Sequence, residues 1–165
     1  MHSSRPALPI CSRIATILFT FLLCSIVTFV SAQQAQPDLT GTWKINLNKS
    51  KLGPRHGPGS DSYIIKHLEP RIEMEHRFFG RSEIYSYVTD GGERVANRSS
   101  VDGKTSAKTY WDGDTLVIEK HQRGIFWVSR YTLSQDGQTL AVTHHNNKSW
   151  FSDAFDESLT YEKQR

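Results

Sequence analysis

Short glycine-containing turn sequences recur along most of this chain, and their spacing constrains the fold more than any other feature. Four of them are Asp-Gly pairs, at 90–91, 102–103, 112–113 and 136–137. Turns about every ten residues are typical of an all-β domain. An Asp-Gly pair supplies the positive φ angles that tight hairpins need. The pattern therefore predicts strands that pair antiparallel with their neighbours in the sequence.

The segments between these turns have the composition of strands, with many β-branched and aromatic residues. None shows a convincing 3.6-residue apolar period, although 149–155 could form a short helical turn. We therefore expect nine or ten strands and essentially no helix after the N-terminal region. The expected strands cover residues 39–48, 61–68, 71–79, 82–89, 93–101, 104–111, 115–121, 125–133, 138–145 and 157–163.

The first of these strands has the clearest pattern. Apolar residues and a glycine occupy alternate positions, and polar residues occupy the positions between them, which is the mark of a strand buried on one side. The buried face is expected to hold Leu39, Gly41, Trp43, Ile45 and Leu47. Residues 49–60 follow, with two prolines and three glycines, and are expected to form an irregular loop.

Nine or ten strands joined by short hairpins must protect the edges of their sheet. Closure into an antiparallel up-and-down β-barrel of about 8–10 strands does so most economically. A two-sheet sandwich is the alternative, but it needs longer crossover connections, and only residues 49–60 are long enough for one. We expect a single barrel domain over residues 39–165, preceded by a flexible segment at 33–38.

The N-terminus has the three parts of a secretory signal peptide. Arg5 and Arg13 provide positive charge, residues 14–30 are apolar, and Ser31-Ala32 ends a short stretch suited to cleavage. We expect cleavage after Ala32 and a secreted or periplasmic protein with no later membrane span. An uncleaved anchor is the alternative. Lipidation at Cys24 is disfavoured because leucine, not a small residue, precedes it.

Removal of residues 1–32 changes what the chain can do chemically. Both cysteines would be lost, which excludes disulfides, thiolate metal sites and cysteine nucleophiles. Two of the 20 basic residues and none of the 17 acidic ones would be lost, leaving a formal charge of +1. A nearly neutral domain gives no electrostatic reason to expect nucleic acid or an anionic membrane surface as a partner.

No catalytic motif is present, so we expect a binding protein without enzymatic activity, metal or cofactor. The sequence lacks a Gly-x-Ser-x-Gly elbow, a phosphate-binding glycine loop and a His-Glu-x-x-His motif. Neighbours such as His144 and His145 project to opposite faces of a strand and cannot bind one metal ion together. A pair of His76 and His144 across the barrel stays open as an alternative.

Several motifs resemble those of known barrel families. Leu-Thr-Gly-Thr-Trp at 39–43 resembles the Gly-x-Trp signature of lipocalins and related calycins, and fatty-acid-binding proteins also begin with Gly-Thr-Trp. Residues 111–116 are similar to the Trp-x-Gly-Asp-x-Leu hairpin of the latter. Together with 41–54, 67–74 and 132–140, they resemble small secreted bacterial proteins described as lipocalin-like and of uncharacterised function.

The resemblance gives Gly41 and Trp43 a structural role. It implies that Trp43 closes one end of the barrel and packs against an arginine from a late strand. Arg130 is the candidate, although strand alternation places it on the face opposite Tyr131. Fatty-acid-binding proteins have two helices after their first strand, where this chain has the loop at 49–60. The resemblance therefore does not extend to a helical lid.

The barrel interior is expected to be rich in aromatic side chains, with a few inward polar groups. Alternation places four such groups inside as candidate ligand-binding residues: His76, Asn97, Tyr131 and His144. Two interpretations stay open. The barrel binds a small apolar or amphipathic molecule, or its lumen is filled by side chains and it acts through its surface. A continuous cavity of about 300 Å³ or more would favour the first.

Overall fold

The computed structural model describes residues 35–54, 61–99, 103–147 and 153–165. Residues 36–165 form a compact unit, and its described part is all β apart from one short 3-10 helix, η1 (Leu47–Lys49). The strands are β1 (Gly41–Ile45), β2 (Asp61–Leu68), β3 (Arg71–Phe78), β4 (Arg81–Val88), β5 (Asp90–Ser99), β6 (Gly103–Asp112), β7 (Thr115–Gln122), β8 (Ile125–Leu133), β9 (Thr139–Asn146) and β10 (Phe155–Lys163).

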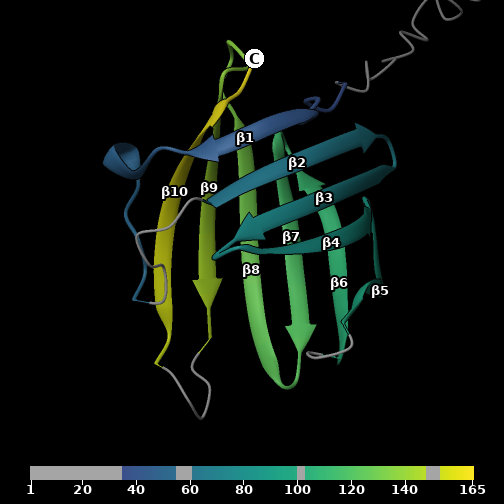
Figure 1. The fold of residues 1–165 in the computed structure, drawn as a ribbon. Helices are drawn as coiled ribbons and strands as arrows, with labels where there is room; N and C mark the ends of the chain where they lie inside the picture. The colour runs from purple at the N-terminus through teal and green to yellow at the C-terminus, as the bar shows by residue number, and fades with distance from the viewer. Residues whose placement is uncertain (1–34, 55–60, 100–102, 148–152) are drawn as a thin grey trace, which may run out of the picture. The chain divides into compact units, whose positions relative to one another are not determined.

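The ten strands form one antiparallel sheet with the order β4-β3-β2-β1-β10-β9-β8-β7-β6-β5. Strands adjacent in the sequence pair with each other, except β4 and β5, and β1 also pairs with β10. The edge strands β4 and β5 lie against each other without a hydrogen-bonded ladder. The predicted up-and-down barrel is therefore confirmed, with one unpaired seam. Figure 1 shows β1–β4 crossing in front of β6–β9 as a second layer.

The glycines of the four Asp-Gly pairs all have positive φ, between 60° and 78°. Two other hairpins turn at Phe79-Gly80 and Arg123-Gly124, where both residues of each pair have positive φ. Such turns match the right-handed twist of the paired strands. One Asp-Gly site departs from the expectation, because Asp90 follows β4 closely and yet β4 and β5 are not paired.

The first strand is shorter than the sequence pattern predicts. It ends at Ile45, where the side chain of Asn46 accepts a hydrogen bond from the backbone N–H of Asn48 and starts η1. Leu47 therefore leaves the buried face and is 44% exposed. Beyond η1, Lys51 forms a β-bridge with Ser158 of β10. The segment expected to be an irregular loop thus begins with ordered structure, and its residues 55–60 lie outside the described part.

Trp43 is fully buried, and its indole Nε1 donates to the carbonyl of Leu39 at 3.0 Å. The basic side chain above its ring is Lys163, with Nζ 5.2 Å from the ring centroid. The expectation that Arg130 takes this place is wrong. Arg130 faces outward and pairs with Asp112 at 3.2 Å, as strand alternation indicated.

Gly41 has a φ of 153°, a conformation that residues with a Cβ rarely adopt. A Cβ there would lie 2.7 Å from Cε of Lys163. The glycine therefore allows the lysine side chain to approach the strand and cover Trp43. The Gly-x-Trp signature describes one packing arrangement at this end of the barrel.

Several expectations fall on residues that the structure does not describe. The signal peptide at 1–32 and its cleavage site lie outside the described residues. So do residues 149–152 of the possible helical turn, whereas Phe155 at its end opens β10. Among the described residues, none forms a helix of the length and hydropathy needed to cross a membrane.

Candidate ligand-binding site in the barrel lumen

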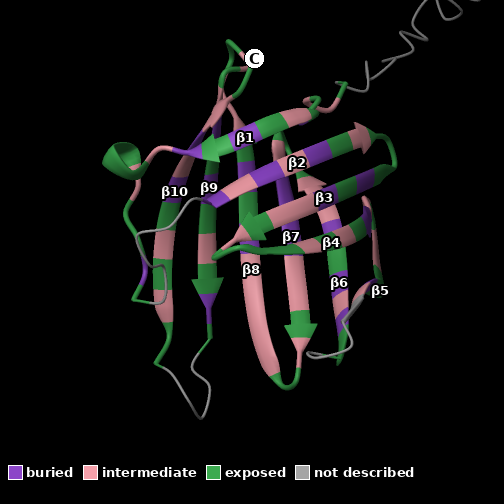
Figure 2. Ribbon diagram, in the orientation of Figure 1, coloured by how far each residue is buried: buried purple, intermediate pink, exposed green. Residues whose placement is uncertain are grey.

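The inward face of the barrel changes from apolar to polar along four consecutive strands, β7 to β10. At one level the inward side chains are apolar and buried, apart from a tyrosine hydroxyl: Leu116, Ile118, Tyr131, Val142 and Leu159. Farther along the same strands they are Lys120, Gln122, Trp127, Ser129, His144, Asn146, Phe155 and Glu157. The lumen is therefore packed in one half and lined by polar and aromatic groups in the other. Figure 2 shows the reduced burial along the lower part of β8.

The strand register places the change from apolar to polar inward side chains at the same height in each of these strands. Lys120 lies opposite Trp127, Trp127 opposite Asn146, and Asn146 opposite Phe155. Side chains directly opposite each other on antiparallel strands project to the same face. These residues therefore form one row across the inner wall, and the hydrogen-bonded ladders fix their order.

A cavity of about 200 Å³ occupies the polar half of the lumen. Besides the row above, it is lined from the crossing layer by Tyr63, His76 and Tyr85. A second cavity of about 200 Å³ adjoins it and shares four lining residues, His76, His144, Phe155 and Glu157. Each is smaller than the roughly 300 Å³ of a typical ligand site. The lumen is thus neither filled solid nor open along its length.

His76 projects into both cavities and is held firmly in place. Its Nε2 lies 2.8 Å from Oδ1 of Asp61, a residue only 3% exposed. Its ring stacks between Tyr63 and Phe78, at centroid distances of 4.4 and 4.7 Å. The buried carboxylate and the two aromatic rings therefore fix the orientation of this imidazole at the cavity wall.

His144 lines the same two cavities from β9, and its Nδ1 lies 2.7 Å from Oγ of Ser129. Tyr131 lies beneath it in the packed half, 2% exposed, with the two rings edge to face. Burial raises the pKa of Tyr131 to about 12, although hydrogen bonds with Tyr63 and Ser129 oppose the shift. Tyr131 is therefore a neutral part of the cavity floor and not of its lining.

Asn97 does not line either cavity. It lies half-buried on β5, opposite Thr105, next to an irregularity in the β5–β6 register between Val95 and Asn97. Of the four candidates from the sequence, the structure brings His76 and His144 together at the cavity and places Tyr131 beside them. Within the described residues, no three His, Cys, Asp or Glu side chains are placed to hold a metal ion.

Sequence reasoning missed two residues that distinguish this cavity, Lys120 and Asn146. Nζ of Lys120 lies 5.1 Å from the ring centroid of Tyr85. Burial lowers the pKa of Lys120, although the carboxylate of Glu83 opposes the shift. Asn146 is 1% exposed, and its Oδ1 has no hydrogen-bond partner in the part of the chain that the structure describes. Alternation along residues 115–122 and 139–146 could have indicated both residues.

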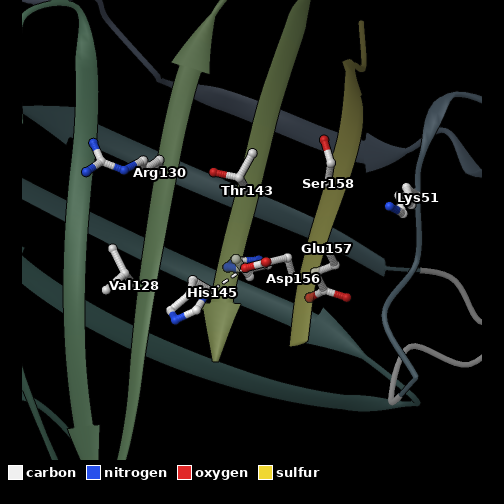
Figure 3. Close-up of a pocket in the computed structure, with 9 residues that line it drawn as sticks. Lys51, Val128, Arg130, Thr143, His145, Asp156, Glu157 and Ser158 are labelled. Carbon is white, nitrogen blue, oxygen red and sulfur yellow. Dashed lines mark hydrogen bonds and ion pairs between the residues drawn. The ribbon is translucent and has the colours of Figure 1, made fainter. Parts of the chain in front are cut away.

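A larger groove of about 330 Å³ lies on the outside of the barrel, over β8, β9 and β10 (Figure 3). Most of its lining residues project away from the lumen, among them Arg130, Thr143 and His145. His145 pairs with Asp156 at 2.6 Å, and both are largely exposed. The groove is an open, solvated surface and offers less desolvation to a ligand than the lumen does.

No protein-family model and no curated protein matches the chain. Among solved structures it is similar to the REP1-NXSQ fatty acid transporter, with a TM-score of 0.59 and 13% identity, over 78% of this chain and 97% of that one. It is also similar to Echinococcus granulosus fatty-acid-binding protein 1, with a TM-score of 0.57 and 15% identity, over 76% and 97% of the two chains.

A third similar structure is Caenorhabditis elegans lipid binding protein 8, with a TM-score of 0.58 and 10% identity, over 76% of this chain and 94% of that one. Each of these proteins is covered almost completely. At such low identity the likeness concerns the backbone alone. The chain thus shares its barrel fold with proteins named for binding or transporting lipids.

Proposed function

We propose that the barrel binds a small, lipid-like amphipathic molecule in the polar half of its lumen. The observation that carries this proposal is the cavity of about 200 Å³ with aromatic walls and inward polar groups. Ligand sites generally combine an apolar surface with a few fixed polar groups. Here Trp127, Tyr85 and Phe155 provide the apolar surface, and His76, His144 and Lys120 the polar groups.

The similar structures support the proposal through their fold, because their names describe fatty-acid and lipid binding. The packed half of the lumen sets a limit on the ligand. Leu116, Val142 and Leu159 fill the space that a long hydrocarbon chain would need. We therefore propose a compact ligand and not a long-chain fatty acid.

The alternative is a filled barrel that acts only through its surface. It would give no reason for the polar lining of the lumen. A buried acceptor without a partner, such as Oδ1 of Asn146, lowers stability by about 1–3 kcal/mol. A partly desolvated lysine adds a further cost. Apolar side chains at Lys120 and Asn146 would make a purely structural barrel more stable, so the polar groups favour binding.

We also propose that this binding takes place after export, outside the cytoplasm. The support is the sequence of residues 1–32, with its positive charges and its apolar stretch from Ile14 to Val30. Expression of the full chain in a bacterium, followed by intact-mass measurement of the periplasmic and secreted fractions, tests it. A mature protein beginning at Gln33 is expected, and full-length protein retained in the cell would overturn the proposal.

Uptake of the uncharged fluorophore N-phenyl-1-naphthylamine tests the binding function without assuming a ligand charge. A saturable rise in fluorescence is expected. It should be lost in Gln122→Trp, which fills the cavity, and kept in Thr132→Trp, which adds the same ring on the outward face of β8. No saturable rise in the wild type, or equal uptake by both variants, would contradict binding in the lumen.

A further inference from the structure

We propose that the ligand is a small acid that also carries a hydrogen-bond donor, with its anionic group on Lys120 and its donor group on Asn146. This inference rests on the proposed binding function and specifies the class of ligand. The two residues lie in one row of the inner wall, on β7 and β9, and Trp127 of β8 lies between them.

Lys120 provides a positive charge that no described residue neutralises directly. Its side chain projects into the cavity, in contact with the ring face of Tyr85. It forms no ion pair with a described residue, and Glu83 acts on it only through longer-range attraction. A cation held away from water binds an anion more strongly than an exposed one does, because less solvent competes for it.

The described carboxylates near the cavity each have a hydrogen-bond donor of their own, so we infer that the anion that pairs with Lys120 comes from the ligand. Asp61 accepts from Nε2 of His76 at 2.8 Å. Glu83 accepts from the hydroxyl of Tyr85. Glu157 accepts from the backbone N–H of Gly53 at 3.1 Å. Each of these carboxylates therefore already accepts a hydrogen bond within the chain, and Lys120 lines the cavity without an ion pair to a described residue.

Asn146 requires a hydrogen-bond donor from the ligand, where Lys120 requires an anion. Asn146 lines the cavity, and its buried Oδ1 accepts no hydrogen bond from any described residue. A carboxylate cannot donate to it, whereas a hydroxyl or an amide N–H of the ligand can. The ligand must therefore carry a donor besides its anionic group.

The sheet sets the approximate separation of the two groups. Adjacent strands lie about 4.8 Å apart, so the backbones of Lys120 and Asn146, two strands apart, are separated by about 10 Å. The indole of Trp127 occupies the interval and offers an apolar surface to the carbon skeleton. A short hydroxy acid has the required arrangement: carboxylate, apolar segment and hydroxyl.

Displacement of N-phenyl-1-naphthylamine by a matched series of eight-carbon compounds tests this inference. The competitors are octanoate, 3-hydroxyoctanoate, 8-hydroxyoctanoate and octanol. The tighter of the two hydroxy acids should bind about fivefold more strongly than octanoate, and octanoate about tenfold more strongly than octanol.

Two substitutions assign these differences to their residues. Lys120→Met should remove or reverse the advantage of octanoate over octanol, since octanol keeps a hydroxyl that can donate to Asn146. Asn146→Leu should remove the advantage of the hydroxy acid over octanoate. Lys108→Met is the matched control, because Nζ of Lys108 lies 5.0 Å from the Tyr110 ring centroid in a similar contact on the outer face. That variant should bind the series as the wild type does.

The outcomes separate the inference from the function on which it rests. Equal displacement by octanol and octanoate, or unchanged ratios in both cavity variants, would overturn the inference while leaving ligand binding intact. Absence of saturable fluorophore binding in the folded wild type would overturn the proposed function itself. Unfolding curves of each variant identify any that fails to fold.

Discussion

Lys163 at the end of β10 lies over the indole of Trp43 in β1, with its Nζ 5.2 Å from the ring centroid. The contact joins the strands through which the barrel closes, since β1 pairs with β10. The indole is fully buried, and its N–H is satisfied by the carbonyl of Leu39. The Gly-x-Trp motif, the positive φ of Gly41 and the packing of Lys163 on Trp43 therefore all contribute to the structure of this end of the barrel.

Substitutions at this contact should separate two contributions to stability: burial of the Trp43 indole and the cation–π contact with Lys163. Trp43→Ala should lower the free energy of unfolding by about 3–5 kcal/mol, because it leaves a cavity in the core. Lys163→Met should lower it by about 0.5–1 kcal/mol, the size of an exposed cation–π contact. Arg130→Met, on the outer face, should change it by less than about 0.5 kcal/mol. Urea unfolding followed by circular dichroism measures all three.

Glu69 should make the stability of the fold depend on acid pH. Burial raises the pKa of Glu69, but hydrogen bonds from Thr89, His67 and Trp111 outweigh it and leave the pKa below its usual value. The ionised form is therefore favoured in the folded state, and its contribution is present above pH 4.5 and lost as the pH falls through the lowered pKa. Glu69→Gln should flatten this part of the pH–stability curve.

The partners of Glu69 provide the control for that measurement. Nε1 of Trp111 donates to Glu69 at 2.6 Å, which ties the β2–β3 turn to β6. Trp111→Phe removes this donor and should retain part of the acid dependence, because Thr89 and His67 still bind the carboxylate. Identical curves for wild type and Glu69→Gln between pH 3 and 6 would show that these bonds contribute nothing.

Asn146→Leu should stabilise the ligand-free protein. Leucine has nearly the shape of asparagine, and the change removes a buried acceptor that has no partner. We expect a gain of about 1 kcal/mol in unfolding free energy, measured without ligand by thermal or chemical unfolding. A loss of similar size would mean that Oδ1 is satisfied in the free protein.

Lys120→Met should also stabilise the free protein, and the gain should depend on pH. The pKa of Lys120 is lowered by burial, so the unfolded chain binds the proton more tightly than the folded one. The wild type should therefore gain stability as the pH rises toward 10.5, and the advantage of the variant, about 1 kcal/mol at pH 7, should shrink. Glu83, Glu157 and His144 face the same space and are unchanged in the comparison.

Replacement of Gly80 or Gly124 by alanine should lower the free energy of unfolding by about 1 kcal/mol. Both have positive φ, 72° and 76°, and a Cβ at either position would meet no atom within 4 Å. The cost therefore reports backbone conformation and not packing. Asparagine at the same positions should restore part of the stability, since it adopts positive φ more readily. Equal stability of the alanine and asparagine variants would contradict this explanation.

The sequence predicted the strands well because turns and alternation are local signals. The expected strands at 61–68 and 125–133 match β2 and β8 residue for residue. The first strand was predicted too long, because the pattern through Leu47 gave no sign that the side chain of Asn46 would cap a 3-10 turn. The missing ladder between β4 and β5 also had no local signal.

The candidate site was predicted only in part because it depends on register. Alternation along single strands was sufficient to place His76 and His144 inside the barrel. Alternation was less informative at Asn97, beside an irregularity in the β5–β6 ladder. The alignment of Lys120 with Asn146 depends on pairings across β8. Such pairings cannot be predicted from alternation along single strands, so the alignment of Lys120, Trp127 and Asn146 became visible only in the structure.

The unpaired seam between β4 and β5 gives the barrel an unequal resistance to opening. Separating any other pair of adjacent strands breaks a ladder of backbone hydrogen bonds, whereas these two strands separate without breaking one. Tyr85, which contacts Lys120, lies on one side of the seam. Spreading the seam therefore widens access to the polar half of the lumen without breaking a backbone ladder. We therefore expect any opening of the barrel to begin between β4 and β5.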